Sequence, residues 1–226
     1  MSHSFRVPFL DKTTIDILYA RKILKKFDES LLLKIKPVDI ESIISNENIA
    51  IKKDRISKDS DVQGMIICNK SDILLWNDVE KNYKTVYCEG KTIYIDSFLT
   101  SVYQINRYRF TLAHEFSHWI LHKNIIKKLS KEKKMLSYLS CTERDIKNEQ
   151  LEKVQANCEW QANYLAGAIL MPYLPIKNYC QEHNLSECYD IRKLAREINI
   201  LANSYQVSTK AMCVRLKQLE YIPQML

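Results

Sequence analysis

Apolar residues recur every three or four positions near the start of the chain, a spacing that is typical of helices. One such set is Ile15, Leu18, Tyr19, Ile23 and Phe27. A second begins after Pro37, where proline is tolerated because the first turn of a helix leaves its N–H groups unpaired. The pattern therefore predicts helices within residues 11–48.

Between residues 49 and 96 the pattern changes to short apolar runs, which indicate strands. The runs cover residues 65–68, 73–76, 85–88 and 92–95. Glu89-Gly90 separates the last two, and glycine can adopt the positive φ that a tight turn requires, so these two runs are expected to form a hairpin. The result would be a small, mainly antiparallel sheet, and an exposed edge strand of such a sheet can bind an extended peptide.

Residues 107–122 read as a helix that carries His114, Glu115 and His118 in the order His-Glu-x-x-His. Successive helical residues turn by about 100°, so the two histidines lie only about 40° apart and can bind one ion. Glu115 lies about 100° from His114, where it can take the proton of a water held by that ion. One helical step further, His122 is expected to be a packed or hydrogen-bonded partner rather than a ligand.

A carboxylate is expected to complete the metal site. Within residues 159–172, Glu159 leads a helix face of small residues, which would let this helix approach the histidines closely. Four other acidic residues follow the histidines without such a face, namely Glu143, Asp145, Glu149 and Glu152. Two neutral imidazoles and one carboxylate suit Zn²⁺ and leave a position open for water, so the sequence predicts a catalytic zinc site.

Composition excludes several other classes of protein. Three glycines in the whole chain cannot form a phosphate-binding loop or a dinucleotide fingerprint. Seven cysteines without a Cys-x-x-Cys pair argue against a disulfide framework and against a cysteine zinc site. Because no signal peptide or membrane-spanning run is visible, we expect a soluble cytoplasmic protein with no membrane contact.

Positive charge raises the question of nucleic-acid binding, because the formal net charge is +7. The lysine run within residues 123–134 contains no aromatic residue, so a solvated surface is favoured over nucleic-acid contact. Residues 191–221 read as two helices joined by a turn near Ser208, which resembles a helix-turn-helix. Lys210, Lys217 and Gln218 could then face DNA, although packing or docking of a partner is favoured over direct DNA reading.

Two motifs together resemble the ImmA/IrrE family of metallopeptidases. They are Arg-Phe-Thr-Leu-Ala-His-Glu-x-x-His at 109–118, and Glu-x-x-Ala-Asn-x-x-Ala followed by Ile-Leu-Met-Pro at 159–172. The resemblance implies an α+β, zincin-like fold with zinc on His114, His118 and Glu159, and with Glu115 as the base. It also implies that Asn163 orients a ligand histidine. Phe116 and Ser117 depart from the leucine-glycine that is more frequent in the family.

The expected organisation is a metallopeptidase domain over residues 1–176 and a helical, helix-turn-helix-like segment over residues 177–226. The first domain would contain helices at 11–48, strands at 49–96 and the metal-site helices at 107–172. The expected function is that of a zinc endopeptidase cleaving a regulatory protein, by resemblance a helix-turn-helix repressor of a mobile element or a stress response. The alternative is a non-catalytic metal-binding regulator that docks to a repressor or to DNA. The sequence leaves open the oligomeric state and the role of residues 123–158.

Overall fold

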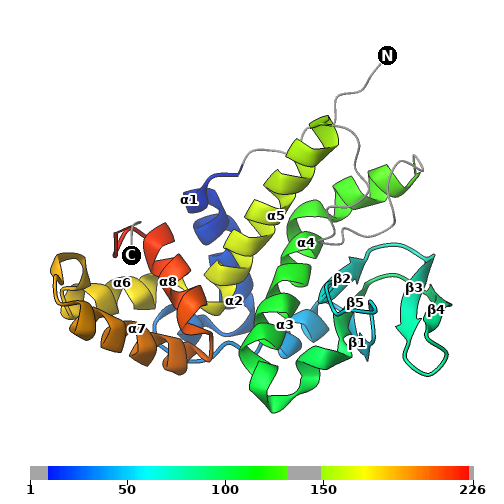
Figure 1. Ribbon diagram of the computed structural model, residues 1–226. Helices are drawn as coiled ribbons and strands as arrows, with labels where there is room; N and C mark the ends of the chain where they lie inside the picture. The colour runs from blue at the N-terminus through cyan, green and yellow to red at the C-terminus, as the bar shows by residue number, and fades with distance from the viewer. Residues whose placement is uncertain (1–9, 132–148, 224–226) are drawn as a thin grey trace. The chain divides into compact units, whose positions relative to one another are not determined.

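The computed structural model describes residues 10–131 and 149–223, and its fold is mixed α+β as predicted (Figure 1). The chain forms two compact units. Glu41–Asn163 make up unit 1, and unit 2 combines Asp11–Ile40 with the stretch from Tyr164 onward. The division predicted at residue 176 stays a prediction.

Unit 1 is built on a three-stranded sheet in the order β1-β5-β2. The central strand β5 (Thr92–Asp96) pairs in parallel with β1 (Ala50–Asp54) and antiparallel with β2 (Gly64–Ile67). Every residue of β5 is buried, as expected for a strand with neighbours on both sides. The alternating apolar pattern did not predict β1, because Lys52 and Lys53 occupy its centre.

A separate hairpin corrects the predicted strand pairing. Strand β3 (Ser71–Asn77) pairs with β4 (Asn82–Cys88), so the hairpin expected between residues 85–88 and 92–95 is wrong. Gly90 does have a positive φ of 84°, but β4 is largely exposed whereas β5 is fully buried, so the two strands suit different surroundings. The actual turn follows Asn77, whose side chain accepts hydrogen bonds from the backbone N–H groups of Val79 and Glu80.

Helix α4 (Ile105–Lys131) packs against β2 and β5 of this sheet (Figure 1). Leu112, Ala113 and Phe116 are completely buried on its inner side. This apolar face fixes the rotation of α4 about its own axis. It therefore also fixes the direction in which the polar residues between Ala113 and Phe116 point. Unit 1 also contains most of α3 (Ile40–Asn46), which lies within the predicted helical range, and the first part of α5 (Glu149–Leu170).

Unit 2 is helical. Its first part is one continuous helix, in which α1 (Lys12–Thr14), the π-helical segment η1 (Ile15–Ala20) and α2 (Arg21–Phe27) follow one another, and the 3-10 turn η2 (Glu29–Leu32) comes next. The end of α5 leads into α6 (Tyr173–Glu182), which the sequence pattern did not predict. Two further helices, α7 (Ile191–Tyr205) and α8 (Thr209–Gln218), confirm the predicted pair, and Ser208 caps α8 by accepting from the Ala211 N–H.

A buried arginine joins the two sequence segments of unit 2. Arg215 of α8 is completely buried and forms an ion pair with Asp16 of η1. Its Nε donates to the backbone oxygen of Met171 over 3.1 Å, and its guanidinium lies 5.3 Å from the centre of the Tyr164 ring. Tyr164 in turn donates its hydroxyl to Asp16 over 2.7 Å. Asp16 of the first segment thus contacts both Arg215 and Tyr164 of the second.

Within the described residues, no helix is both long enough and apolar enough to cross a membrane.

Candidate metal centre

Helix α4 presents two imidazoles one turn apart. Both His114 and His118 are buried, and their Nε2 atoms lie only 3.0 Å from each other. Residues four apart on a helix share a face, which explains why the spacing in the sequence is sufficient to bring these atoms together. The pair thus directs two nitrogen atoms at a single point.

Glu159 of α5 approaches the same point. One of its carboxylate oxygens lies 3.2 Å from His114 Nε2, and the other lies 3.2 Å from His118 Nε2. Ligands about 2.0–2.2 Å from a tetrahedral zinc ion lie about 3.3–3.6 Å from one another, so the observed separations are only slightly shorter. His114, His118 and Glu159 therefore form a possible metal site.

The outer nitrogen of His114 is held by an amide. Its Nδ1 lies 3.1 Å from Oδ1 of Asn163, one turn after Glu159 on α5. An amide oxygen can only accept, so the hydrogen is on Nδ1 and the Nε2 of the neutral ring carries a free lone pair. Glu159 and Asn163 thus contact the same imidazole from one helix, at its two different nitrogens.

A longer chain of hydrogen bonds determines which ring nitrogen of His118 carries the hydrogen. His122 Nε2 lies 3.0 Å from Oε1 of Gln161, which can only accept, so the hydrogen of a neutral His122 is on Nε2. Its Nδ1 must then accept, and it lies 3.0 Å from Nδ1 of His118. His118 therefore donates through Nδ1 and, like His114, directs a bare Nε2 at Glu159. The two bare Nε2 atoms, 3.0 Å apart, and the two Glu159 oxygens that lie 3.2 Å from them repel one another unless a cation lies among them.

The pKa shifts agree with this assignment of protons. Burial lowers the pKa of His118 and lowers that of His122 to about 4, so both rings are neutral at pH 7. The set consists of two neutral imidazoles and one carboxylate, which is a combination suited to zinc.

Glu115 lies beside the three candidate ligands but is not one of them. Its side chain is buried, and burial raises its pKa to about 7, although a hydrogen bond from the Ile66 backbone opposes the rise. Within the described part of the chain, no group forms a hydrogen bond to its Oε2. A carboxylate with a pKa near neutrality and an oxygen available for a proton is suited to general-base chemistry.

Gly64 at the start of β2 is a site residue that sequence reasoning missed. A Cβ at this position would lie 2.6 Å from Thr111 Cγ2 and 2.9 Å from Glu115 Cγ. Real Cβ atoms essentially never come this close to other atoms, so only glycine lets β2 lie against this part of α4. The absence of a side chain at Gly64 thus makes room for Glu115.

We expect Gly64→Ala and Gly167→Ala to change stability in opposite directions. Gly64→Ala forces Thr111 and Glu115 to move, so it should lower the free energy of unfolding by about 1–3 kcal/mol. At Gly167, within α5, the nearest atoms to an added Cβ lie 3.8–4.0 Å away, which is ordinary contact. Alanine there should raise the free energy of unfolding by about 0.5–1 kcal/mol, because it restricts the unfolded chain. Urea unfolding of both variants measures the two changes, and equal signs would contradict this account of Gly64.

The other candidate ligands were His122 and four acidic residues that follow the histidines in the sequence. His122 is not in the group of three ligands, and both of its ring nitrogens face other residues. Glu143 and Asp145 lie outside the described residues, and the side chains of Glu149 and Glu152 are likewise not described. Gln161 was not predicted, because a glutamine between two motif positions gives no signal by itself.

The small-residue face of α5 only partly explains how Glu159 reaches the histidines. Ala162 and Ala166 are completely buried, as close packing requires. An added Cβ at Gly167, however, would face Arg215 and Gln218 of α8. Gly167, on the same small-residue face, therefore serves packing against α8 within unit 2.

The predicted lysine run is described only at its start. Nζ of Lys123 lies 5.1 Å from the centre of the Trp119 ring, and Nζ of Lys127 lies 5.9 Å from it. These cations lie over an aromatic face of the same helix. Residues 132–134 of the run lie outside the described part of the chain.

Comparison with known proteins places the chain in a family. Among solved structures, a Mycobacterium tuberculosis transcriptional regulator is similar, with 14% sequence identity and a TM-score of 0.48. The similarity covers 94% of this chain and 48% of that protein, so the chain spans about half of its length. No curated protein sequence matches the chain. The family model Peptidase M78, described as the IrrE N-terminal-like domain, matches residues 70–217, a range that includes His114, His118, Glu159 and Glu115. Since this match covers more than half of the sequence, the chain belongs to the ImmA/IrrE family.

Proposed function

We propose that this chain is a zinc-dependent endopeptidase that cleaves a regulatory protein. The observation that carries the proposal is the meeting of His114, His118 and Glu159 at 3.0–3.2 Å beside the buried base Glu115. A purely structural zinc site needs four protein ligands and no base. Three ligands with an adjacent carboxylate instead favour a catalytic site over a non-catalytic regulator.

In the proposed mechanism, His114, His118 and Glu159 hold the zinc ion, which, when bound, supplies Lewis-acid activation of a water molecule and of the scissile carbonyl. Glu115 accepts the proton of the attacking water and returns it to the leaving amine. Asn163 and His122 keep the two ligand imidazoles in the tautomer that leaves each Nε2 free.

The proposed substrate is an extended segment of a protein. Strand β2 is an edge strand of the sheet and lies against α4 at Gly64, beside Glu115. A peptide that adds to such an edge is held by its backbone, which would bring one of its peptide bonds to the site. The family resemblance suggests a helix-turn-helix repressor as the natural substrate.

We expect the zinc-loaded chain to cut a helix-turn-helix repressor encoded beside it at one defined bond. Purified repressor and a mixed peptide library are incubated separately with the chain, and the products are identified by mass spectrometry. A zinc chelator should abolish cleavage, and added zinc should restore it. Cleavage of the library without cleavage of the repressor would contradict the substrate class alone. If a chain with measured full zinc occupancy cuts neither, the endopeptidase proposal is wrong.

A further inference from the structure

Unit 2 contains a cavity that is separate in its residues from the metal centre. Its volume is about 260 Å³, and it lies between the N-terminal helix and the junction of α5 with α6. Its inner wall is apolar and buried, formed in part by Ala20, Leu24 and Ala168. Ligand sites in proteins are typically apolar cavities with a small number of placed polar groups.

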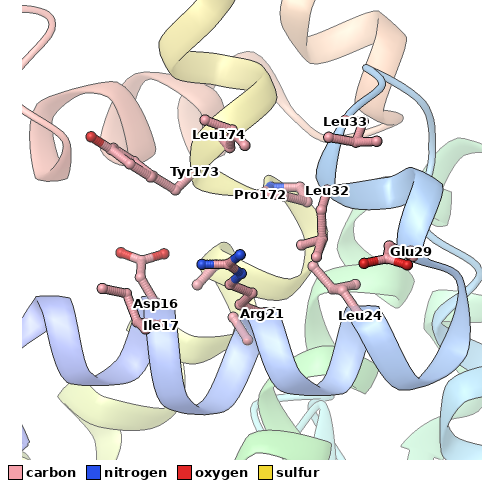
Figure 2. Close-up of a pocket in the computed structure, with 12 residues that line it drawn as sticks. Asp16, Ile17, Arg21, Leu24, Glu29, Leu32, Leu33, Pro172, Tyr173 and Leu174 are labelled. Carbon is pink, nitrogen blue, oxygen red and sulfur yellow. The ribbon is translucent and has the colours of Figure 1, made fainter.

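Three charged residues line the cavity, and two of them already have partners. Asp16 pairs with Arg215 and accepts the Tyr164 hydroxyl, so both of its oxygens are used. Glu29 pairs with Lys25 over 3.4 Å. Figure 2 shows the third, Arg21, extending from its helix into the space below Pro172. Within the described ranges, its guanidinium has no ion-pair or hydrogen-bond partner. The cavity therefore carries one uncompensated positive charge.

The helix that forms one wall has an unusual backbone. Asp16, Ile17 and Ala20 belong to the π-helical segment η1, and the N–H of Arg21 donates to the backbone oxygen of Asp16. A π-turn widens the helix and places residues five apart on one face, which brings Arg21 to the same side as Asp16. Such segments are rare and occur frequently at functional sites.

Exposed apolar side chains surround the opening. Ile17, Leu33, Tyr173 and Leu174 line the cavity, and between 40% and 66% of each is exposed. Leaving four large apolar residues together in water has a cost that a bound apolar ligand would remove.

We propose that this cavity binds an aliphatic monocarboxylate of medium chain length, with its chain against the apolar wall and its carboxylate on Arg21. The choice between a fatty acid and a peptide rests on hydrogen bonds. A peptide brings several N–H and C=O groups, whereas Arg21 is the one lining charge left to satisfy them among the residues described. A monocarboxylate has a single polar end. The volume is below the range of about 300–1,000 Å³ found for drug-sized ligands, which favours a chain of medium length over a long one.

Titration calorimetry of the full chain with butanoate, hexanoate, octanoate and decanoate tests the proposal. Each added methylene should tighten binding about fourfold until the cavity is full, after which the affinity should stop rising. 1-Octanol and octylammonium should bind more weakly than octanoate. Affinities should be the same with and without zinc, which separates this cavity from any carboxylate bound at the metal centre.

Two variants test the two ends of the ligand, and a third serves as the control. Arg21→Gln should weaken octanoate binding about tenfold and leave 1-octanol unchanged. Leu33→Ser removes an exposed part of the wall, so it should weaken both ligands without lowering the unfolding temperature. Lys22→Gln removes the same charge from an exposed neighbour outside the cavity and should change neither.

Two results would overturn the proposal. Octanoate binding that is as tight in Arg21→Gln as in the parent shows that the carboxylate is not recognised. The absence of saturable binding across the series in a folded chain shows that the cavity is not a site for these ligands.

Discussion

Glu115→Gln is expected to retain zinc and to lose peptide-bond cleavage by about 10²–10⁴-fold, the contribution typical of a positioned general base. Glutamine has nearly the same shape, so the neighbouring imidazoles should keep their positions. It cannot take up the proton of the attacking water, however. Elemental analysis gives the zinc content, and the rate of repressor or peptide cleavage gives the activity.

The control for this variant is Glu80→Gln, an exposed glutamate outside the site, which should change neither zinc content nor rate. Cleavage by Glu115→Gln at the parent rate would exclude Glu115 as the base.

The same variant should also change how the stability of the metal-free chain depends on pH. The folded-state pKa of about 7 exceeds the ordinary 4.5, so the parent loses stability as the pH rises from 4.5 to 7. Glu115→Gln should therefore be more stable than the parent at pH 8 by up to about 3 kcal/mol, with little difference below pH 4.5.

Glu159→Ala is expected to remove most of the bound zinc. The two imidazoles alone leave the ion with two protein ligands, and neither supplies a negative charge. Asn163→Ala should have a smaller effect, about 10–100-fold in affinity, because it removes an outer partner and not a ligand. Zinc content after dialysis, measured by elemental analysis, ranks the variants.

Glu149→Ala provides the matched control, since it removes a carboxylate from the first turn of the same helix and should leave zinc content at the parent level. Full zinc retention in Glu159→Ala would exclude Glu159 as the third ligand. In that case His122 would become the leading alternative, and His122→Ala would have to lose the metal.

The residues of the candidate site were predictable where they depend on helical spacing. His114 and His118 are four apart on a helix, and that spacing alone brings their Nε2 atoms to 3.0 Å. Glu159 required a motif as well, because nothing local indicates that two helices distant in sequence meet. Gly64 depends on how β2 lies against α4, and no pattern around a single glycine reveals which side chain it accommodates.

The strand pairing could not be predicted from the local sequence. A run of apolar residues followed by Glu89-Gly90 and another apolar run satisfies the local rule for a hairpin. The partners of β5 are nevertheless β1 and β2, which lie earlier in the chain. Burial of β5 between them outweighs the local turn, and only tertiary packing contains that information. The charged strand β1 was missed for the same reason, since its place at an edge of the sheet tolerates lysines.

The ion pair between Asp16 and Arg215 has a consequence for how the chain folds during synthesis. Residues 11–40 leave the ribosome early, but the other half of their unit, from Tyr164 onward, is made much later. Until α8 emerges, Asp16 lacks its ion-pair partner and the apolar side of the first helix has no partner to pack against. The final packing of this helix is therefore delayed until after residues 41–163 have been made. Unit 1 is continuous in sequence apart from the chain start and can form before the ribosome reaches Arg215. The order of synthesis therefore favours completion of the metal centre before that of the helical unit.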